Sequence, residues 1–143
     1  MRTRDDLKKM SDTALLALLM WGEARGEGEE GMRAVGHVVL NRVGRPGWWG
    51  RNLNEVCLKK WQFSCFNPDD PNLPKLLALD LKSPTPEFAD TIGLAGDILA
   101  GVSQDPTGGA TSYISTSCKP IPKWATPDTF IKQIGRQLFY RAG

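Results

Sequence analysis

One glutamate in the first quarter of the chain has a setting that suits acid catalysis. Leu16 and Leu19 precede Glu23 by seven and four residues, so the three side chains share one face of a helix. A carboxyl group at the end of such an apolar stripe faces the core or the wall of a cleft, where desolvation favours its protonated form. Cleavage of a glycosidic bond needs a proton donor of this kind. The alternative is a structural carboxylate paired with one of three arginines, Arg25, Arg33 or Arg42.

A second carboxylate follows at the mouth of the same turn. Glu27 stands between Gly26 and Gly28 and could complete a two-carboxylate site with Glu23. The competing interpretation is an ordinary loop charge. Glu29 and Arg33, four residues apart, are expected to form a solvated ion pair on a helix surface.

Aromatic and polar side chains are spread over segments that read as loops. Flat rings with a polar edge suit stacking on sugars, although some of them must serve only to anchor loops. The aromatic candidates are Trp48, Trp49, Trp61, Phe63, Tyr113 and Trp124. The hydrogen-bonding candidates for a saccharide site are Gln62, Ser64, Asn67, Thr111 and Ser112.

Cysteine and histidine are too few and too irregular for a metal centre. The chain has three cysteines, Cys57, Cys65 and Cys118, and one histidine, His37. We expect no metal and no cofactor, and we interpret the cysteines as small buried side chains. A Cys57–Cys65 bridge after export is the alternative. His37 is expected to be a partly buried helix residue.

The elements that must position these residues are mostly helices. Ser11 or Asp12 can cap a central helix over 13–24, and Asn52 can cap a short one that ends near Lys59. Further helices are predicted over 29–43 and about 87–100, with a helical turn or two over 75–81. We expect a long ordered loop over 61–74, a short strand over 110–115, and helix or strand over 130–141. The fold class is therefore mainly α (α+β), with at most a small β-sheet.

Size and charge narrow the class of protein further. The chain has 143 residues, 41% of them hydrophobic and 24% charged, which fits a single domain over 1–143 with a core of about 11–140. The net charge is +2, and the basic residues are scattered, so nucleic-acid binding is not favoured. The apolar run 14–21 is too short to span a bilayer. Asp5, Asp6 and Asp12 argue against a signal peptide.

Four blocks of sequence resemble a known family. The run 21–27, WGEARGE, with 30–43, EGMRAVGHVVLNRV, is similar to the opening motif of the SleB-type cell wall hydrolases, the spore-cortex-lytic enzyme family. The other blocks follow in order: Trp61–Ser64, then 105–110 with Tyr113, then 134–135 with 138–140. The resemblance extends from about Ser11 to Tyr140.

The resemblance implies a compact, mostly helical domain similar to the lysozyme-like lytic transglycosylases. It implies that Glu23 is catalytic and that Gln62, Phe63, Ser64 and Tyr113 line a saccharide cleft. Together with Trp61, Thr111 and Ser112, which were singled out by residue type, these four are the substrate-binding candidates. The family cuts peptidoglycan between N-acetylmuramic acid and N-acetylglucosamine, and the transglycosylase reaction leaves 1,6-anhydro-muramic acid. Two alternatives are a hydrolytic muramidase that uses Glu27 or an aspartate, and a non-catalytic peptidoglycan-binding or phage structural module.

The chain departs from many relatives in that we find no export signal and no separate wall-binding domain. This departure favours a bacteriophage endolysin, acting in host lysis, over a role in spore germination. We expect a monomer that is made in the host cytoplasm and reaches the glycan strands of the periplasmic wall through a holin. No stable membrane insertion is expected.

Overall fold

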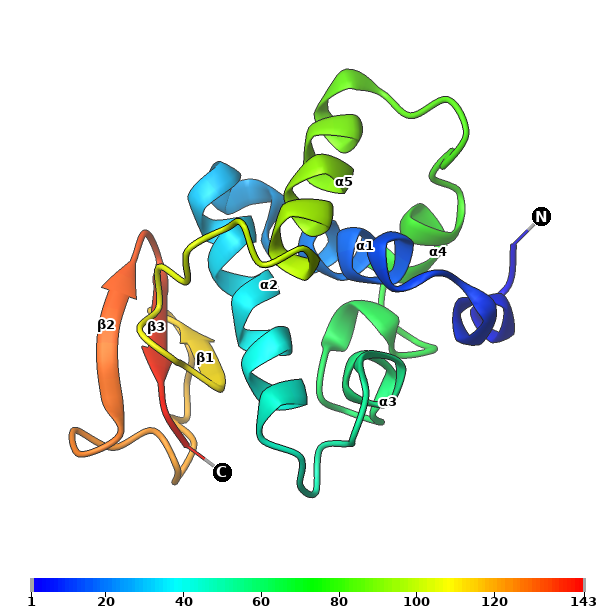
Figure 1. Cartoon of the computed structure of the whole chain (residues 1–143). Helices are drawn as coiled ribbons and strands as arrows, with labels where there is room; N and C mark the ends of the chain where they lie inside the picture. Colours follow the sequence, from blue (N-terminus) through cyan, green and yellow to red (C-terminus); the bar gives the residue numbers. More distant parts are fainter. Residues whose placement is uncertain (1, 143) are drawn as a thin grey trace.

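A helical body and a small sheet make up residues 2–142, the part of the chain that the computed structural model describes (Figure 1). The helices are α1 (Asp12–Ala24), α2 (Gly28–Gly44), α3 (Leu53–Leu58), α4 (Asn72–Leu77) and α5 (Pro86–Leu99). Short 3-10 turns are η1 (Arg4–Lys9), η2 (Arg25–Glu27) and η3 (Ser64–Phe66), and the strands are β1 (Ser112–Ser115), β2 (Phe130–Ile134) and β3 (Gln137–Tyr140). The mainly α fold with a small sheet is confirmed. Within the described residues, no helix is long and apolar enough to cross a membrane.

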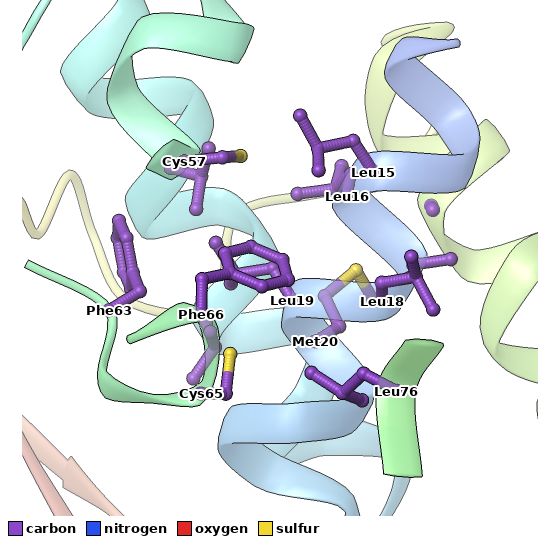
Figure 2. Packing of buried hydrophobic residues seen from close by; sticks show 14 of the residues in the cluster. Leu15, Leu16, Leu18, Leu19, Met20, Cys57, Phe63, Cys65, Phe66 and Leu76 are labelled. Carbon is purple, nitrogen blue, oxygen red and sulfur yellow. The ribbon is translucent and has the colours of Figure 1, made fainter. Parts of the chain in front are cut away.

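Helix α1 runs through the centre of the helical body. Its six residues from Leu15 to Met20 are fully buried, because α2, α3, α4 and α5 all pack around it. Figure 2 shows Leu16 and Leu19 on the side of α1 nearest Phe66, whereas Leu18 extends from the other side of the helix. The Ser11 hydroxyl accepts a hydrogen bond from the Ala14 N–H at 3.2 Å and caps the helix. The predicted central helix is confirmed, and Ser11 is its cap.

Helix α2 separates the helical body from the sheet (Figure 1). On one side, Gly36 allows close packing, since a Cβ atom there would lie 2.7 Å from Ile98 and 2.9 Å from Met20. On the other side, Ala34 and Val38 pack with Ala110 and Phe139 in a second, smaller cluster. Helix α2 therefore fixes the sheet relative to α1.

The carboxyl-terminal segment, ambiguous between helix and strand from its sequence, forms a β-hairpin. The sheet order is β1-β3-β2, and both pairs are antiparallel. Gly135, with φ +58°, makes the turn between β2 and β3, a conformation that suits glycine. Tyr113 of β1 lies opposite Phe139 of β3. This pairing places Tyr113 beside α2.

The segment 61–81 differs from the prediction. Helix α4 begins at Asn72 and ends at Leu77, so the predicted loop over 61–74 ends earlier and the helical turns over 75–81 lie too far along the chain. Pro74 falls in the first turn of α4, where a missing N–H costs no hydrogen bond. The Asp70 carboxylate accepts a hydrogen bond from the Asn72 N–H at 2.8 Å and supports this start. The residues that read as loop breakers therefore begin a helix.

Candidate active site

Glu23 lies in the last turn of α1, half-buried, where α1 meets the segment after α3 and strand β1. The Tyr113 hydroxyl donates a hydrogen bond to Glu23 Oε1 at 2.6 Å. The Cys65 N–H and the Ser64 hydroxyl donate to Glu23 Oε2 at 3.1 and 3.4 Å. Both oxygens are therefore oriented by neutral donors.

The arginines that could have paired with Glu23 are engaged elsewhere. Arg25 donates to Asn72 at 2.9 Å and to the Trp21 carbonyl, and Arg33 forms an ion pair with Glu29 at 2.9 Å. Among residues 2–142, Glu23 belongs to no ion pair. The structure thus disfavours the interpretation of Glu23 as a salt-bridge partner.

A cavity of about 370 Å³, here called the catalytic cavity, opens beside Glu23. Its lining consists of Glu23, Arg42, Trp48, Trp61, Gln62, Phe63, Ser64, Ser112, Tyr113, Trp124 and Ala142. Six of the seven predicted substrate-binding residues are in this lining. Thr111 is the exception, since it is buried and its hydroxyl donates to the Ala142 carbonyl at 2.8 Å. Thr111 therefore ties the chain end to β1 instead of facing Glu23.

The four tryptophans singled out in the sequence as candidates, Trp48, Trp49, Trp61 and Trp124, divide into two groups. Trp48, Trp61 and Trp124 are 56%, 62% and 38% exposed, and all three line the catalytic cavity. Trp49 is only 4% exposed, and its indole N–H donates to the Arg42 and Arg45 carbonyls at 3.0 Å. Trp61 has a φ of +67°, which is uncommon for a bulky residue. Three tryptophans are thus available for contact with a ligand, and one anchors a loop.

Arg42 lines the catalytic cavity, although the sequence indicated it only as a possible partner of Glu23. It is buried between the rings of Trp49 and Phe63, whose centroids lie 5.2 and 5.1 Å from its guanidinium carbon. Its Nε donates to the Thr111 carbonyl at 2.6 Å and its Nη1 to Gln62 Oε1 at 3.4 Å. Burial lowers the pKa of the Arg42 guanidinium. The signal in the sequence was an arginine in register with Val35, Val38 and Val39 on an apolar face.

Burial also acts on the groups around Glu23. Desolvation raises the pKa of Tyr113 well above its ordinary value, and the neighbouring Glu23 carboxylate adds to this effect. Tyr113 is therefore a protonated donor at neutral pH. Burial raises the pKa of the Cys57 and Cys65 thiols in the same way. In the described residues, both cysteines are buried and neither forms a disulfide.

Glu27 lies in an adjoining cavity and has a strong partner. Arg136 Nη2 and Nε donate to Glu27 Oε2 at 2.6 and 2.9 Å, and the Arg136 N–H donates to Oε1 at 2.9 Å. The hydrogen bond from the Arg136 N–H, followed by those from its side chain, lowers the pKa of Glu27. Both oxygens are occupied, so this geometry favours a structural carboxylate that joins η2 to the hairpin turn.

His37 is buried in α2, and its Nε2 lies 2.9 Å from the Ser103 hydroxyl. It is not among the residues that line the catalytic cavity. Among residues 2–142, no three acidic, cysteine or histidine side chains are grouped closely enough to hold a metal ion.

Comparisons with known proteins agree with the fold and with the motif blocks. A family model described as Cell Wall Hydrolase matches residues 26–140. A spore cortex-lytic enzyme of Halalkalibacterium halodurans is 30% identical over 137 residues, which cover 90% of this chain and 34% of that protein. The chain thus spans about a third of this curated relative.

Two solved structures superpose on most of the chain, each at 26% sequence identity. The catalytic domain of the germination-specific lytic transglycosylase SleB from Bacillus anthracis has a TM-score of 0.65 and covers 90% of this chain and 93% of its own. The catalytic domain of the Bacillus cereus SleB protein has a TM-score of 0.67, with 90% and 88% covered. The predicted SleB-type family and fold are confirmed.

Proposed function

The chain belongs to the cell wall hydrolase family, and from this premise we propose that it cuts the glycan strands of peptidoglycan at the β-1,4 bond between N-acetylmuramic acid and N-acetylglucosamine. One observation carries the proposal. Glu23 is the only acidic residue among those described that line the catalytic cavity, and its two oxygens are held by Tyr113, Ser64 and Cys65. A single, half-buried carboxyl group that is held in one orientation beside a cavity suits general acid–base catalysis.

The reaction that fits one carboxyl group is lytic transglycosylation. Protonated Glu23 donates its proton to the glycosidic oxygen, and the bond from that oxygen to C1 of muramic acid breaks through an oxocarbenium-like transition state. N-acetylglucosamine leaves with a free 4-hydroxyl group. The Glu23 carboxylate then accepts the proton of the muramic acid 6-hydroxyl as that oxygen bonds to C1. The product is a 1,6-anhydro ring, and no water is consumed.

Hydrolysis by a muramidase remains the second candidate because Glu23 and Glu27 line one adjoining cavity. A hydrolytic mechanism would need Glu27 or another carboxylate to activate water or to act as a nucleophile. The three hydrogen bonds from Arg136 oppose that role, since they lower the pKa of Glu27, which makes it a weaker base and nucleophile, and they occupy both of its oxygens. The geometry therefore supports transglycosylation over hydrolysis.

The residues around Glu23 have chemistry that suits a saccharide. Trp48, Trp61 and Trp124 offer exposed rings for stacking on sugar faces, and Gln62 and Ser112 offer hydrogen-bonding groups. In this proposal, Phe63 and Tyr113 form the floor of the cavity. Phe63 packs under Arg42, and Tyr113 orients Glu23.

The test is a digest of purified peptidoglycan with the wild type and with Glu23→Gln, analysed by mass spectrometry. We expect 1,6-anhydro-muramic acid ends from the wild type and at least a hundredfold slower release by the variant, because an amide cannot donate the proton. Glu27→Gln is the matched control and should keep most of the activity. Reducing muramic acid ends would instead support a muramidase. Binding to peptidoglycan without release of fragments would support the non-catalytic binding module.

The setting in which the protein acts is a proposal that rests on the sequence alone. We propose that the protein acts as a phage endolysin, as a monomer that accumulates in the host cytoplasm and reaches the wall through a holin. Co-expression with a holin should lyse a bacterial culture, whereas expression alone should not. Lysis without the holin would contradict this route.

A further inference from the structure

The catalytic cavity adjoins two further cavities. It shares Glu23 with a cavity of about 440 Å³, here called the hydroxyl end, whose other lining residues are Glu27, Ser115, Thr116, Ser117, Arg136 and Gln137. It shares Trp48 and Ala142 with a cavity of about 430 Å³, here called the arginine end, whose other lining residues are Arg45, Pro46, Gly47, Trp49, Thr111 and Arg141. Because neighbouring cavities share lining residues, we describe the three together as a groove in which a polymer can extend beyond Glu23.

The two ends of the groove differ in charge. At the hydroxyl end, Arg136 is neutralised by Glu27 at 2.6 Å, so hydroxyl and amide groups dominate. The arginine end has no acidic residue in its described lining. Arg45 and Arg141 are both exposed, and neither forms an ion pair with any of residues 2–142. Two guanidinium groups are thus available to a ligand.

This difference in charge between the two ends of the groove matches the chemistry of a peptidoglycan strand. The N-acetylated sugars are uncharged, whereas the stem peptides on muramic acid carry free carboxylates. A guanidinium group binds a carboxylate through two parallel hydrogen bonds, which makes arginine the side chain best suited to this anion. Trp48 lines both the arginine end and the catalytic cavity, so its exposed ring can support a sugar that extends from one to the other.

We propose that the arginine end binds a stem-peptide carboxylate on the strand being cut. The inference rests on the proposed function, and it adds a basis for substrate selection: strands that carry peptides are preferred over bare glycan. Arg45 and Arg141 act here as specificity-determining residues, remote from the bond that breaks.

The experiment compares soluble glycan strands that keep their stem peptides with bare strands, from which an amidase has removed the peptides and on which the lactyl carboxylates that this hydrolysis exposes have been converted to uncharged amides. Both samples are first freed of phosphate-containing wall polymers, so that carboxylates are the anions in question. The proteins are the wild type, Arg45→Gln/Arg141→Gln, and the charge-retaining Arg45→Lys/Arg141→Lys. Lys75→Gln/Lys82→Gln is the matched control, since it removes two exposed positive charges outside the groove.

We expect the wild type to cut peptide-bearing strands with a kcat/KM roughly three- to tenfold above that for bare strands, as suits exposed charge pairs. The double glutamine variant should lose this preference, the double lysine variant should keep part of it, and the control should match the wild type. A wild type without the preference, or a glutamine variant that retains it, would overturn the proposal.

A binding measurement separates this proposal from the proposed function. With Glu23→Gln as the background, peptide-bearing strands should bind more tightly than bare strands, and the two glutamine substitutions should abolish the difference. If the wild type cuts neither kind of strand, the proposed function fails, but this measurement still decides the role of the arginine end. Equal binding of the two strands would overturn it.

Discussion

At the residue scale, the environment of Glu23 depends on one short contact. The Tyr113 hydroxyl donates to Glu23 Oε1 at 2.6 Å, and burial keeps this hydroxyl protonated because it raises the pKa of Tyr113. The other donors, the Cys65 N–H and the Ser64 hydroxyl, approach Oε2 at 3.1 and 3.4 Å. Tyr113 is therefore a positioning residue. Without its hydroxyl, Glu23 Oε1 has no donor among the described residues, because the Cys65 N–H and the Ser64 hydroxyl contact only Oε2.

The substitution Tyr113→Phe tests this role. A hydrogen bond to a charged group contributes about 1.5–3 kcal/mol, so we expect kcat to fall roughly ten- to hundredfold while KM changes little. Ser64→Ala, which removes the longer contact, should cost less. Steady-state rates on peptidoglycan give both values, and circular dichroism checks the fold. An unchanged kcat in Tyr113→Phe would show that the contact does not orient Glu23 for the reaction.

The ion pair of Glu27 with Arg136 predicts how stability depends on pH. Arg136 holds the pKa of Glu27 below its ordinary value of 4.5, so folding favours the ionised carboxylate. This stabilisation is complete above pH 4.5 and is lost as the pH falls through the lowered pKa of the folded state. Thermal melts between pH 7 and 3 should therefore show a smaller decrease for Glu27→Gln than for the wild type. Glu29→Gln, which alters only an exposed pair, should follow the wild type.

At the element scale, the long helices, the short helix α3 with its Asn52 cap and strand β1 were predictable, whereas helix α4 and the β-hairpin were not. The sequence placed α1, α2 and α5 within a residue or two, because each has an apolar face and a clear end signal, such as the Ser11 cap of α1. Helix α4 was misplaced because Pro74 reads as a breaker unless the helix start is already known. The hairpin was ambiguous because β2 buries little of its surface, so its apolar pattern is weak.

Gly36 shows how tightly these elements pack. A Cβ atom on Gly36 would meet Ile98 of α5 at 2.7 Å and Met20 of α1 at 2.9 Å. We expect Gly36→Ala to lower the free energy of unfolding by about 1–3 kcal/mol, the usual cost of overpacking. Gly93→Ala in α5 is the control, since a Cβ atom there meets nothing within 4 Å and should gain up to about 1 kcal/mol of helix propensity. Urea unfolding of both variants measures the difference, and equal effects would contradict the close packing.

At the scale of the whole molecule, the groove forms where the helical body meets the sheet. Glu23 could be found from the sequence because its register depends on α1 alone. The places of Arg42 and Ala142 in the lining could not, since only the complete fold brings their segments together. Thr111 was predicted for the cleft, but its buried hydroxyl donates to the Ala142 carbonyl, and Thr111 does not line the catalytic cavity. The sequence thus indicated Glu23 and most of the residues around it, and the complete fold added Arg42 and Ala142 to the lining.

Arg42 connects several segments that line the groove, which leads to a prediction about their stability. Its guanidinium group bonds Thr111 before β1 and Gln62 before η3, and it packs between Trp49 and Phe63. Arg42→Met keeps an apolar stem but leaves the Thr111 carbonyl and the Gln62 amide oxygen without this donor, at a cost of about 1–3 kcal/mol. Hydrogen exchange should therefore accelerate in segments 61–66 and 111–115 and stay unchanged in α1. Arg51→Met, at an exposed position, should alter neither region. If Arg42 stabilises only the groove, its loss accelerates exchange only in the segments that it connects. Equal acceleration throughout the described chain would instead show that Arg42 stabilises the whole fold.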